Sequence, residues 1–348
     1  MTAEGTDGAA APGAGADGGT LLDVRDLKVE FRTRDGVAHA VNGVGYRVAA
    51  GETLAVLGES GSGKSVTAQA VLGILDTPPG HVTGGEILFH GRDLLRMGAE
   101  ERRRIRGTKL AMIFQDALSA LNPVLSVGAQ LGEMFEVHRG MSRKEARGRA
   151  AELMDRVRIP AARQRVGDYP HQFSGGMRQR IMIAMALALG PDLIIADEPT
   201  TALDVTVQAQ VMDLLAELQR EYAMGLVLIT HDLGVVADVA DRIAVMYAGR
   251  IVETAPVRDL YRAPAHPYTR GLLDSVPRLD HKGRELYAIK GLPPSLTAVP
   301  PGCPFHPRCP RARDICRTDR PPLFAVAPGR TSACHFWEET VNERGERP

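Results

Sequence analysis

The sequence has no apolar segment long enough to cross a membrane. Its longest unbroken apolar run covers residues 181–189, whereas a spanning helix needs roughly 20 apolar residues. It also lacks a basic start followed by an apolar stretch, so we expect no secretory signal and a place in the cytoplasm. Neither sign of charge is in excess, because Lys+Arg and Asp+Glu both number 42. The bulk charge therefore gives no indication of a nucleic-acid or anionic-lipid partner.

Cysteine is almost absent. The chain has four cysteines in 348 residues, and all four lie beyond residue 300. In a reducing compartment, such a cluster is more often a metal site than a disulfide framework. Disorder of the whole chain is excluded, because 44% of the residues are hydrophobic and the length allows one large domain, or a large and a small one, with a buried core.

The first half of the chain predicts a tail, a β-layer and a helical insert. Residues 1–20 are almost all Gly, Ala and small polar residues, which bury too little apolar area to become ordered, and we expect a disordered tail. Runs rich in β-forming residues at 22–31, 38–48 and 53–57 indicate a small antiparallel β-layer that leads into a buried strand. Residues 118–170 are polar, rich in Arg and partly helix-periodic, so we expect a helical subdomain there.

The second half predicts a parallel sheet followed by an appendage. Apolar runs at 193–196, 226–230 and 243–246 alternate with helix-length segments, as in βαβ units. Beyond about residue 256, proline becomes frequent and this strand pattern stops. We therefore expect an α/β domain over residues 21–260 and a C-terminal appendage over residues 261–348.

A phosphate-binding motif stands directly after the expected strand at 53–57. It fits the Walker A pattern G-x-x-x-x-G-K-[ST] with Gly58, Glu59, Ser60, Gly61, Ser62, Gly63, Lys64 and Ser65. Glycines let backbone N–H groups turn toward phosphates, and the helix expected next presents its positive end to them. We expect Lys64 to reach the β- and γ-phosphates of a nucleotide and Ser65 to ligate Mg²⁺.

An acidic pair follows the apolar run at 193–196, where the second half of such a site is expected. Asp197 is placed to hold Mg²⁺, directly or through water. Glu198 comes next, and a carboxylate there can polarise the attacking water as a general base. An acidic pair can also be a solvated turn, but its company with a Walker A motif favours the catalytic interpretation.

Between these motifs lies a third one, which indicates a family. Phe173-Ser174-Gly175-Gly176-Met177-Arg178-Gln179 resembles the signature sequence of ABC transporter ATPases, with Phe173 and Met177 where Leu and Gln are commoner. The resemblance continues in the family's order with Gln115 as the Q-loop, Ala202-Leu203-Asp204 as the D-loop and His231 as the switch histidine. It implies a P-loop NTPase fold of the ABC type, covering residues 22 to about 255.

The resemblance also implies roles for these residues. Ser174, Gly175 and Gly176 open the apolar segment 181–189, which reads as a buried helix, so their N–H groups would form a second anion-binding cap. In similar proteins ATP is held between the Walker A motif of one subunit and the signature of another. His231 would contact the γ-phosphate, Gln115 would join the Mg²⁺ site and report nucleotide state, and Phe31 would stack on adenine.

The C-terminal part narrows the resemblance to one branch of the family. Residues 264–273 and the proline-rich stretch up to Cys303 resemble ATPases of dipeptide, oligopeptide and nickel importers, as does the Phe-Ser-Gly-Gly-Met-Arg-Gln-Arg form of the signature. This resemblance implies two transmembrane permease subunits, a second related ATPase subunit in a heterodimer, and an extracytoplasmic substrate-binding protein. The chain would then be peripheral, on the cytoplasmic face of the inner membrane, and would drive import of di- or oligopeptides.

Other functions fit part of this pattern. An importer of nickel or another metal complex, or a drug exporter, would share every ATPase motif. A soluble ABC ATPase acting on DNA or ribosomes fits less well, because this chain has one Walker A motif and a short helical insert. The basic residues near 102–106 and 139–165 are interrupted by acidic ones, so they indicate a solvated surface and not a nucleic-acid site.

The cysteines leave three alternatives open. Their positions are Cys303, Cys309, Cys316 and Cys334, a spacing unlike the paired C-x-x-C of zinc ribbons. Four thiolates suit an iron–sulfur cluster or Zn²⁺, and four ordinary thiols filling small gaps are the third alternative. The resemblance to peptide importers favours a [4Fe-4S] cluster.

Overall fold

The computed structural model describes residues 19–34, 36–201, 203–275 and 289–342. Within these ranges the chain forms two sheets, and the smaller one is antiparallel. Its four strands lie in the order β2 (Gly36–Ala49), β1 (Thr20–Thr33), β4 (Gly80–Phe89) and β5 (Arg92–Asp93). Residues 1–18, most of the predicted tail, lie outside the described residues, and β1 already begins at Thr20.

The larger sheet has eight described strands, five of which are parallel. The parallel strands are β9 (Arg242–Tyr247), β3 (Thr53–Leu57), β8 (Gly225–Thr230), β7 (Leu193–Asp197) and β6 (Leu110–Ile113), in that spatial order. Three antiparallel strands extend the β9 edge, namely β10 (Arg250–Pro256), β12 (Arg330–Ser332) and β11 (Phe324–Ala327). Every residue of β3, β7 and β8 is buried, which explains their continuous apolar sequences.

Helices cover both faces of the parallel strands. The helix α1 (Lys64–Leu72) packs between the two sheets with alternate residues of β3, β7 and β8. The intervening residues of β7 and β8 face α7 (Gly175–Leu187) and α8 (Val205–Tyr222). The apolar strands therefore have two buried faces, as the α/β prediction requires.

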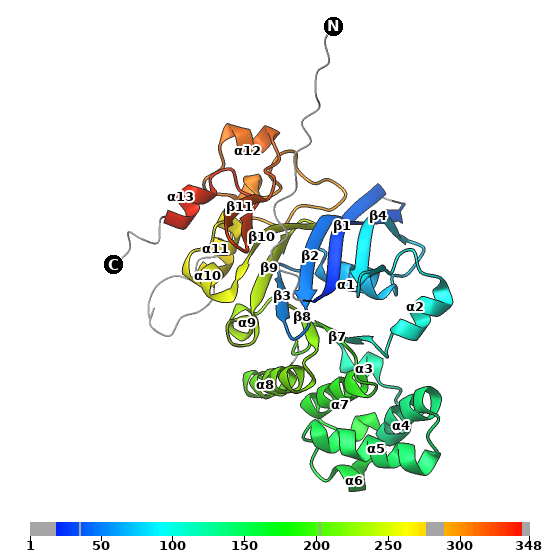
Figure 1. The fold of residues 1–348 in the computed structure, drawn as a ribbon. Helices are drawn as coiled ribbons and strands as arrows, with labels where there is room; N and C mark the ends of the chain where they lie inside the picture. The colour runs from blue at the N-terminus through cyan, green and yellow to red at the C-terminus, as the bar shows by residue number, and fades with distance from the viewer. Residues whose placement is uncertain (1–18, 35, 202, 276–288, 343–348) are drawn as a thin grey trace.

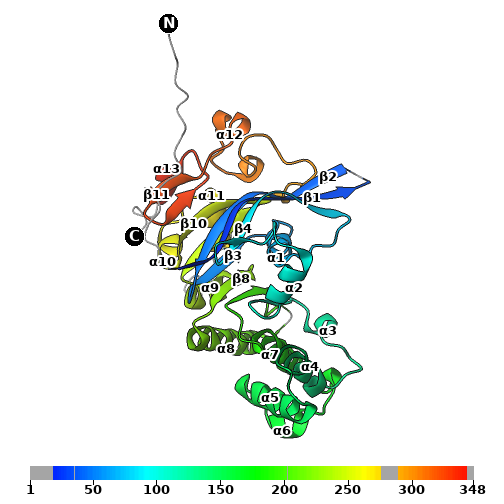
Figure 2. The same cartoon turned by 45° about the vertical axis from the view of Figure 1, so that its right-hand side comes forward.

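Helices also make up the predicted insert. They are α3 (Ala117–Ala120), α4 (Val127–Arg139), α5 (Arg143–Arg156) and α6 (Ala162–Arg165), followed by the 3₁₀ turn η1 (Pro170–Gln172). Ser142 caps α5 in a capping box with Glu145. In both views these helices project at the end of the molecule opposite the C-terminal elements (Figures 1 and 2).

The C-terminal elements are short. They are α10 (Val257–Arg262), α11 (Pro267–Asp274), the 3₁₀ turn η2 (His306–Arg308), α12 (Asp314–Thr318) and α13 (Trp337–Asn342), while α2 (Ala99–Ile105) and α9 (Leu233–Val239) complete the set of described helices. No helix within the described ranges is long and apolar enough to cross a membrane.

A buried polar joint ties the C-terminal elements to the sheet. The carboxylate of Glu253 in β10 accepts hydrogen bonds from the backbone N–H groups of Ala265 (2.7 Å) and His266 (2.9 Å). On β12, the hydroxyl of Ser332 donates to the backbone oxygen of Ala265 (2.9 Å). The proline-rich segment therefore adds two strands to the sheet, although its composition gave no strand signal.

The predicted strands agree with the structure to within two residues at each end. The sequence did not predict β4, a glycine-containing strand in which only three of the ten residues are buried. At Gly85 the backbone has a φ of +99°, and a Cβ there would lie 2.6 Å from the Cα of Leu27. This close approach coincides with an irregular register between β1 and β4, which explains why a simple alternation is absent.

Candidate active site

The Walker A loop joins β3 to α1, as predicted. Gly63 precedes α1 with a φ of +103°, and a Cβ there would lie only 2.3 Å from the backbone oxygen of Ala40 in β2. No other residue type fits this position without displacing the backbone. The ammonium of Lys64 is buried and donates to the backbone oxygens of Gly58 (2.8 Å) and Glu59 (3.0 Å). The loop therefore curls around its own lysine.

Charge around Lys64 is balanced by nearby carboxylates. Burial lowers the pKa of Lys64, whereas Glu198, Asp197 and Glu59 each act to raise it. Burial in turn raises the pKa of Asp197, and a hydrogen bond from Ser65 opposes that rise. The site thus holds one cation among several acidic groups, an arrangement that suits the addition of phosphates together with a divalent cation.

The two expected Mg²⁺ ligands are in contact. The hydroxyl of Ser65, in the first turn of α1, lies 3.0 Å from Oδ1 of Asp197 at the end of β7. Asp197 is buried, and a hydroxyl and a carboxylate oxygen are both ligand types that Mg²⁺ prefers. The pair was predicted from two motifs more than a hundred residues apart in the sequence.

Glu198 is the centre of a second group of side chains. Its Oε2 accepts hydrogen bonds from Nε2 of Gln115 (3.0 Å) and from the hydroxyl of Thr201 (2.9 Å). Nδ1 of His231 lies 3.4 Å from its Oε1. These residues follow β6, β7 and β8 at the carboxyl edge of the sheet, where α/β proteins bind ligands. Glu198 itself has a φ of +46°, a strained conformation for a non-glycine residue and one that is concentrated at functional sites.

The Gln115 side chain reaches Glu198 and has no hydrogen bond to Asp197 or Ser65 in the described structure. Thr201 was not among the predicted site residues, although it follows Glu198 by only three positions. Of the D-loop, Ala202 lies outside the described residues, Leu203 lies 3.6 Å from where a Cβ of Gly175 would be, and Asp204 precedes α8 without making a side-chain cap.

The signature residues form the start of α7. The Ser174 hydroxyl caps this helix by accepting from the N–H of Met177 (3.4 Å). A Cβ at Gly176 would lie 2.5 Å from Val207 of α8, so α7 and α8 pack closely there. No hydrogen bond or ion pair in the described structure joins Ser174, Gly175 or Gly176 to the Walker A loop of the same chain. The helix N-terminus is therefore capped, and within the described residues it makes no contact of this kind with the phosphate loop of its own chain.

Phe31 lies on β1, beside the strand that covers the Walker A loop. Its register partner on β2 is Ala38, two residues before the Ala40 oxygen that contacts Gly63. The ring is partly buried against the core between the two sheets.

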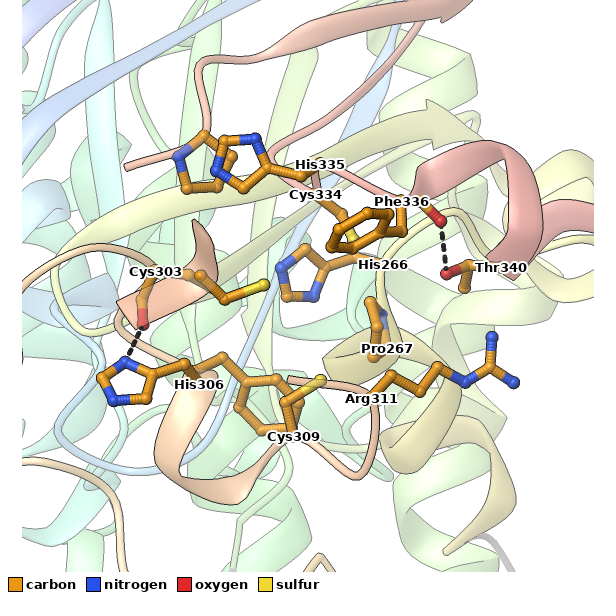
Figure 3. A pocket seen from close by; sticks show the side chains of 13 residues that line it. His266, Pro267, Cys303, His306, Cys309, Arg311, Cys334, His335, Phe336 and Thr340 are labelled. Atoms are coloured by element: carbon orange, nitrogen blue, oxygen red, sulfur yellow. Dashed lines mark hydrogen bonds between the residues drawn. The ribbon is translucent and has the colours of Figure 1, made fainter. Parts of the chain in front are cut away.

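All four cysteines line one pocket in the C-terminal elements (Figure 3). Among the described residues no carboxylate lines it, and its walls include Phe305, Phe336 and Pro321. Burial raises the pKa of Cys303 to about 11 and that of Cys334 to about 12, and neighbouring cysteines add to both rises. In the described ranges no three His, Cys, Asp or Glu side chains are grouped so as to hold a metal ion.

Comparison with known proteins agrees with this geometry. Residues 41–201 match the model of the ABC transporter family, and residues 252–316 match the C-terminal region of oligopeptide/dipeptide transporters. The oligopeptide transport ATP-binding protein OppD of Salmonella typhimurium is 53% identical over 90% of this chain and 93% of its own length. The dipeptide transport ATP-binding protein DppD of Bacillus subtilis is also 53% identical, over 89% of this chain and 91% of its own length. The chain belongs to the peptide-transporter branch of the ABC transporter ATP-binding subunits.

Solved structures confirm the predicted P-loop fold of this ABC subunit. The dimeric ATP-binding cassette MJ0796, bound to ADP and Pi, is 28% identical, and the alignment has a TM-score of 0.61 over 68% of this chain and 99% of that one. The structure of cbiO1 from Clostridium perfringens is also 28% identical, with a TM-score of 0.59 over 70% of this chain and 90% of that one. The predicted family and the predicted ATPase coupled to transport are thereby confirmed, and membership implies membrane-spanning partner subunits.

Proposed function

We propose that this ABC subunit binds MgATP in the Walker A loop and hydrolyses it to drive import of di- or oligopeptides. The observation that carries the proposal is the hydrogen-bonded group around Glu198, which lies at the same sheet edge as Lys64. The peptide cargo is supported by the printed names of the relatives and by the match to the peptide-transporter C-terminal region.

Each predicted residue has a place in this mechanism. The N–H groups around Ser60, Gly61, Ser62 and Gly63 would surround the phosphates, and Lys64 would exchange its two carbonyl partners for phosphate oxygens. Ser65 and Asp197, already in contact, would ligate Mg²⁺ together with Gln115. Phe31 would stack on adenine from the neighbouring strand.

Hydrolysis follows from the position of Glu198. Its carboxylate would accept a proton from a water molecule while the water oxygen attacks the γ-phosphorus and the bond to the β–γ bridging oxygen breaks. His231, beside Glu198, would donate a hydrogen bond to the γ-phosphate as negative charge develops there. Gln115 and Thr201 hold the carboxylate in place and so position the base.

The signature helix points to a dimer. Ser174, Gly175 and Gly176 form a helix N-terminus that, among the described residues, has no hydrogen bond to the Walker A loop, so they would cap the ATP of a second, related ATPase subunit. The similar cassette MJ0796 is dimeric. We place the pair on the cytoplasmic face of the inner membrane, against two permease subunits that receive cargo from an extracytoplasmic binding protein.

The cysteine pocket suits a [4Fe-4S] cluster. Four cysteines, Cys303, Cys309, Cys316 and Cys334, converge on one carboxylate-free pocket, yet they are not drawn together as a single ion requires. Thiolates there are costly to bury alone, as their raised pKa values indicate, and cationic iron would offset that cost. Bound there, a cluster would cross-link separate points of a proline-rich segment that has little core of its own.

The peptide cargo is tested by deleting the gene for this chain in its native host. We expect growth on peptides as the sole nitrogen source to be lost and uptake of a labelled dipeptide or tripeptide to fall to background, while uptake of free amino acids stays unchanged. Re-expression of the wild-type chain should restore uptake. Normal peptide uptake in the deletion strain, or a defect confined to nickel or another cargo, would contradict the peptide assignment.

The cluster is tested by the optical spectrum and metal content of anaerobically purified full-length protein. We expect broad visible absorption and about four irons per chain, both lost when Cys303 and Cys316 are replaced by Ala. Colourless protein with one zinc, or with no metal, would overturn the cluster assignment and leave the ATPase assignment intact.

A further inference from the structure

One residue of the Walker A loop, Glu59, is held by side chains of the C-terminal elements. Glu59 is the second residue of the motif, and its side chain points to Arg308 in the C-terminal turn η2. The guanidinium makes a bidentate ion pair with the carboxylate, with 2.6 Å between Nη1 and Oε2 and 2.9 Å between Nη2 and Oε1. The Arg308 side chain is only 6% exposed. An ion pair with this geometry and burial is of the strong, orienting kind.

The backbone of Glu59 is bound as well. Its N–H donates to the phenol oxygen of Tyr268 in α11 (2.9 Å), and its carbonyl oxygen accepts from Lys64 (3.0 Å) and from the N–H of Ser62 (3.2 Å). Arg308 also donates to the hydroxyl of Tyr247 (3.4 Å) at the end of β9. Two residues of the C-terminal elements, Arg308 and Tyr268, therefore bind Glu59. The backbone oxygen of Glu59 also accepts a hydrogen bond from Lys64.

The negative charge of Glu59 makes its ion pair with Arg308 relevant to nucleotide binding. Glu59 is one of three carboxylates that act on the pKa of Lys64, so it lies within electrostatic reach of the phosphate cradle. Unpaired, a carboxylate there would repel the phosphates of ATP. The ion pair with Arg308 neutralises this charge.

Arg308 also lies in the segment that carries two cysteines of the pocket. It stands between Cys303 and Cys309 in a tight turn, in which the N–H of His306 donates to the oxygen of Cys303 and the N–H of Cys309 donates to the oxygen of His306. The turn that holds the backbone of Arg308 is therefore the same turn that brings Cys303 and Cys309 to the pocket.

We propose that Arg308, supported by Tyr268, is a positioning residue for the Walker A loop, through which the C-terminal elements set the affinity of the cassette for ATP. The inference rests on the proposed binding of ATP by this loop. It does not depend on what the cysteines hold, because the ion pair and the turn are properties of the chain itself.

The test is a double-mutant cycle on the full-length chain, read as affinity for the non-hydrolysable analogue AMP-PNP with Mg²⁺. We expect Arg308→Gln to weaken binding about tenfold, which is about 1.4 kcal/mol, because it leaves Glu59 unpaired. Glu59→Gln should change affinity by less than about threefold, and the double variant should recover most of the loss caused by Arg308→Gln. Arg308→Lys, which keeps charge without the bidentate fork, should fall between the wild type and Arg308→Gln.

Two further variants separate positioning from folding. Tyr268→Phe removes the acceptor for the Glu59 N–H and keeps the ring, and we expect about threefold weaker binding at an unchanged melting temperature. The matched control is Arg313→Gln, which breaks a 2.6 Å ion pair with Glu339 and a stacking contact 3.9 Å from the Phe336 ring within the same C-terminal elements. It should leave AMP-PNP affinity unchanged. In the assembled transporter, Arg308→Gln should raise the KM for ATP and leave kcat unchanged.

The outcomes are distinct. If the wild-type chain does not bind AMP-PNP at all, the proposed function fails. If it binds, and Arg308→Gln binds within twofold of it, the positioning role is overturned. A loss in Arg308→Gln that Glu59→Gln does not relieve, or an equal loss in Arg313→Gln, would overturn it too, because the effect would not pass through this ion pair.

Discussion

Replacing Glu198 by Gln should stop turnover while leaving ATP bound. A glutamine has nearly the same shape, and its carbonyl oxygen can still accept from Gln115 and Thr201, which now donate to Oε2 at 3.0 and 2.9 Å. It cannot take a proton from water. Since general-base catalysis contributes about 10²–10⁴-fold to a rate, we expect ATP hydrolysis by the assembled transporter to fall at least about a hundredfold.

Three measurements check this result. Phosphate release gives the turnover, retained nucleotide after rapid gel filtration gives trapping, and AMP-PNP affinity gives binding, which should stay within about threefold of the wild type. The control is Glu152→Gln, the same chemical change at an exposed glutamate that pairs with Arg149 on α5 of the helical insert. Undiminished hydrolysis by Glu198→Gln would show that another group is the base.

The parts of the site that follow buried strands were predictable from sequence. The runs that became β3, β7 and β8 are apolar throughout because both of their faces are covered, and a run of this kind can be recognised without any partner being known. The backbone geometry at position 63 requires glycine, which explains why the motif has Gly63 there. These features placed Lys64, Ser65, Asp197 and Glu198 correctly relative to the sheet.

The contacts among the side chains around Glu198 depend on the spatial order of the strands, which is not a local property of the sequence. Parallel strands bring their carboxyl ends to one edge, so the meeting of Gln115, Glu198 and His231 follows from strand order once that order is known. The order itself, with β8 between β3 and β7, cannot be read from apolar runs alone. Here the resemblance to a family supplied what periodicity could not.

The C-terminal contacts were beyond sequence reasoning. Arg308 and Glu59 are separated by 249 positions, and neither lies in a periodic segment that would predict a shared surface. In a segment rich in proline, short strands such as β11 and β12 form because an open sheet edge beside β10 accepts them. Tertiary context therefore decides structure there, and local propensity has little influence.

Replacing Lys64 by Ala should abolish nucleotide binding, in contrast to the change at Glu198. The ammonium is buried, and it is the group to which three nearby carboxylates are electrostatically coupled. Without it, Asp197 and Glu198 would face the phosphates with no opposing charge from the loop. We expect AMP-PNP affinity to fall at least about a hundredfold, or about 2.7 kcal/mol, and ATP hydrolysis to fall to background.

The substitution also leaves the backbone oxygens of Gly58 and Glu59 without the donor that now holds the loop closed at 2.8 and 3.0 Å. Melting temperature should therefore be recorded beside affinity, so that a loss of binding by folded protein is separated from unfolding. Lys109→Ala is the matched control, because this exposed lysine pairs with Asp192 (3.2 Å) just before β6 and β7 begin, at the opposite edge of the sheet. Retained AMP-PNP affinity in folded Lys64→Ala would mean that backbone N–H groups and Mg²⁺ alone hold the phosphates, and the charge balance inferred for this site would then be wrong.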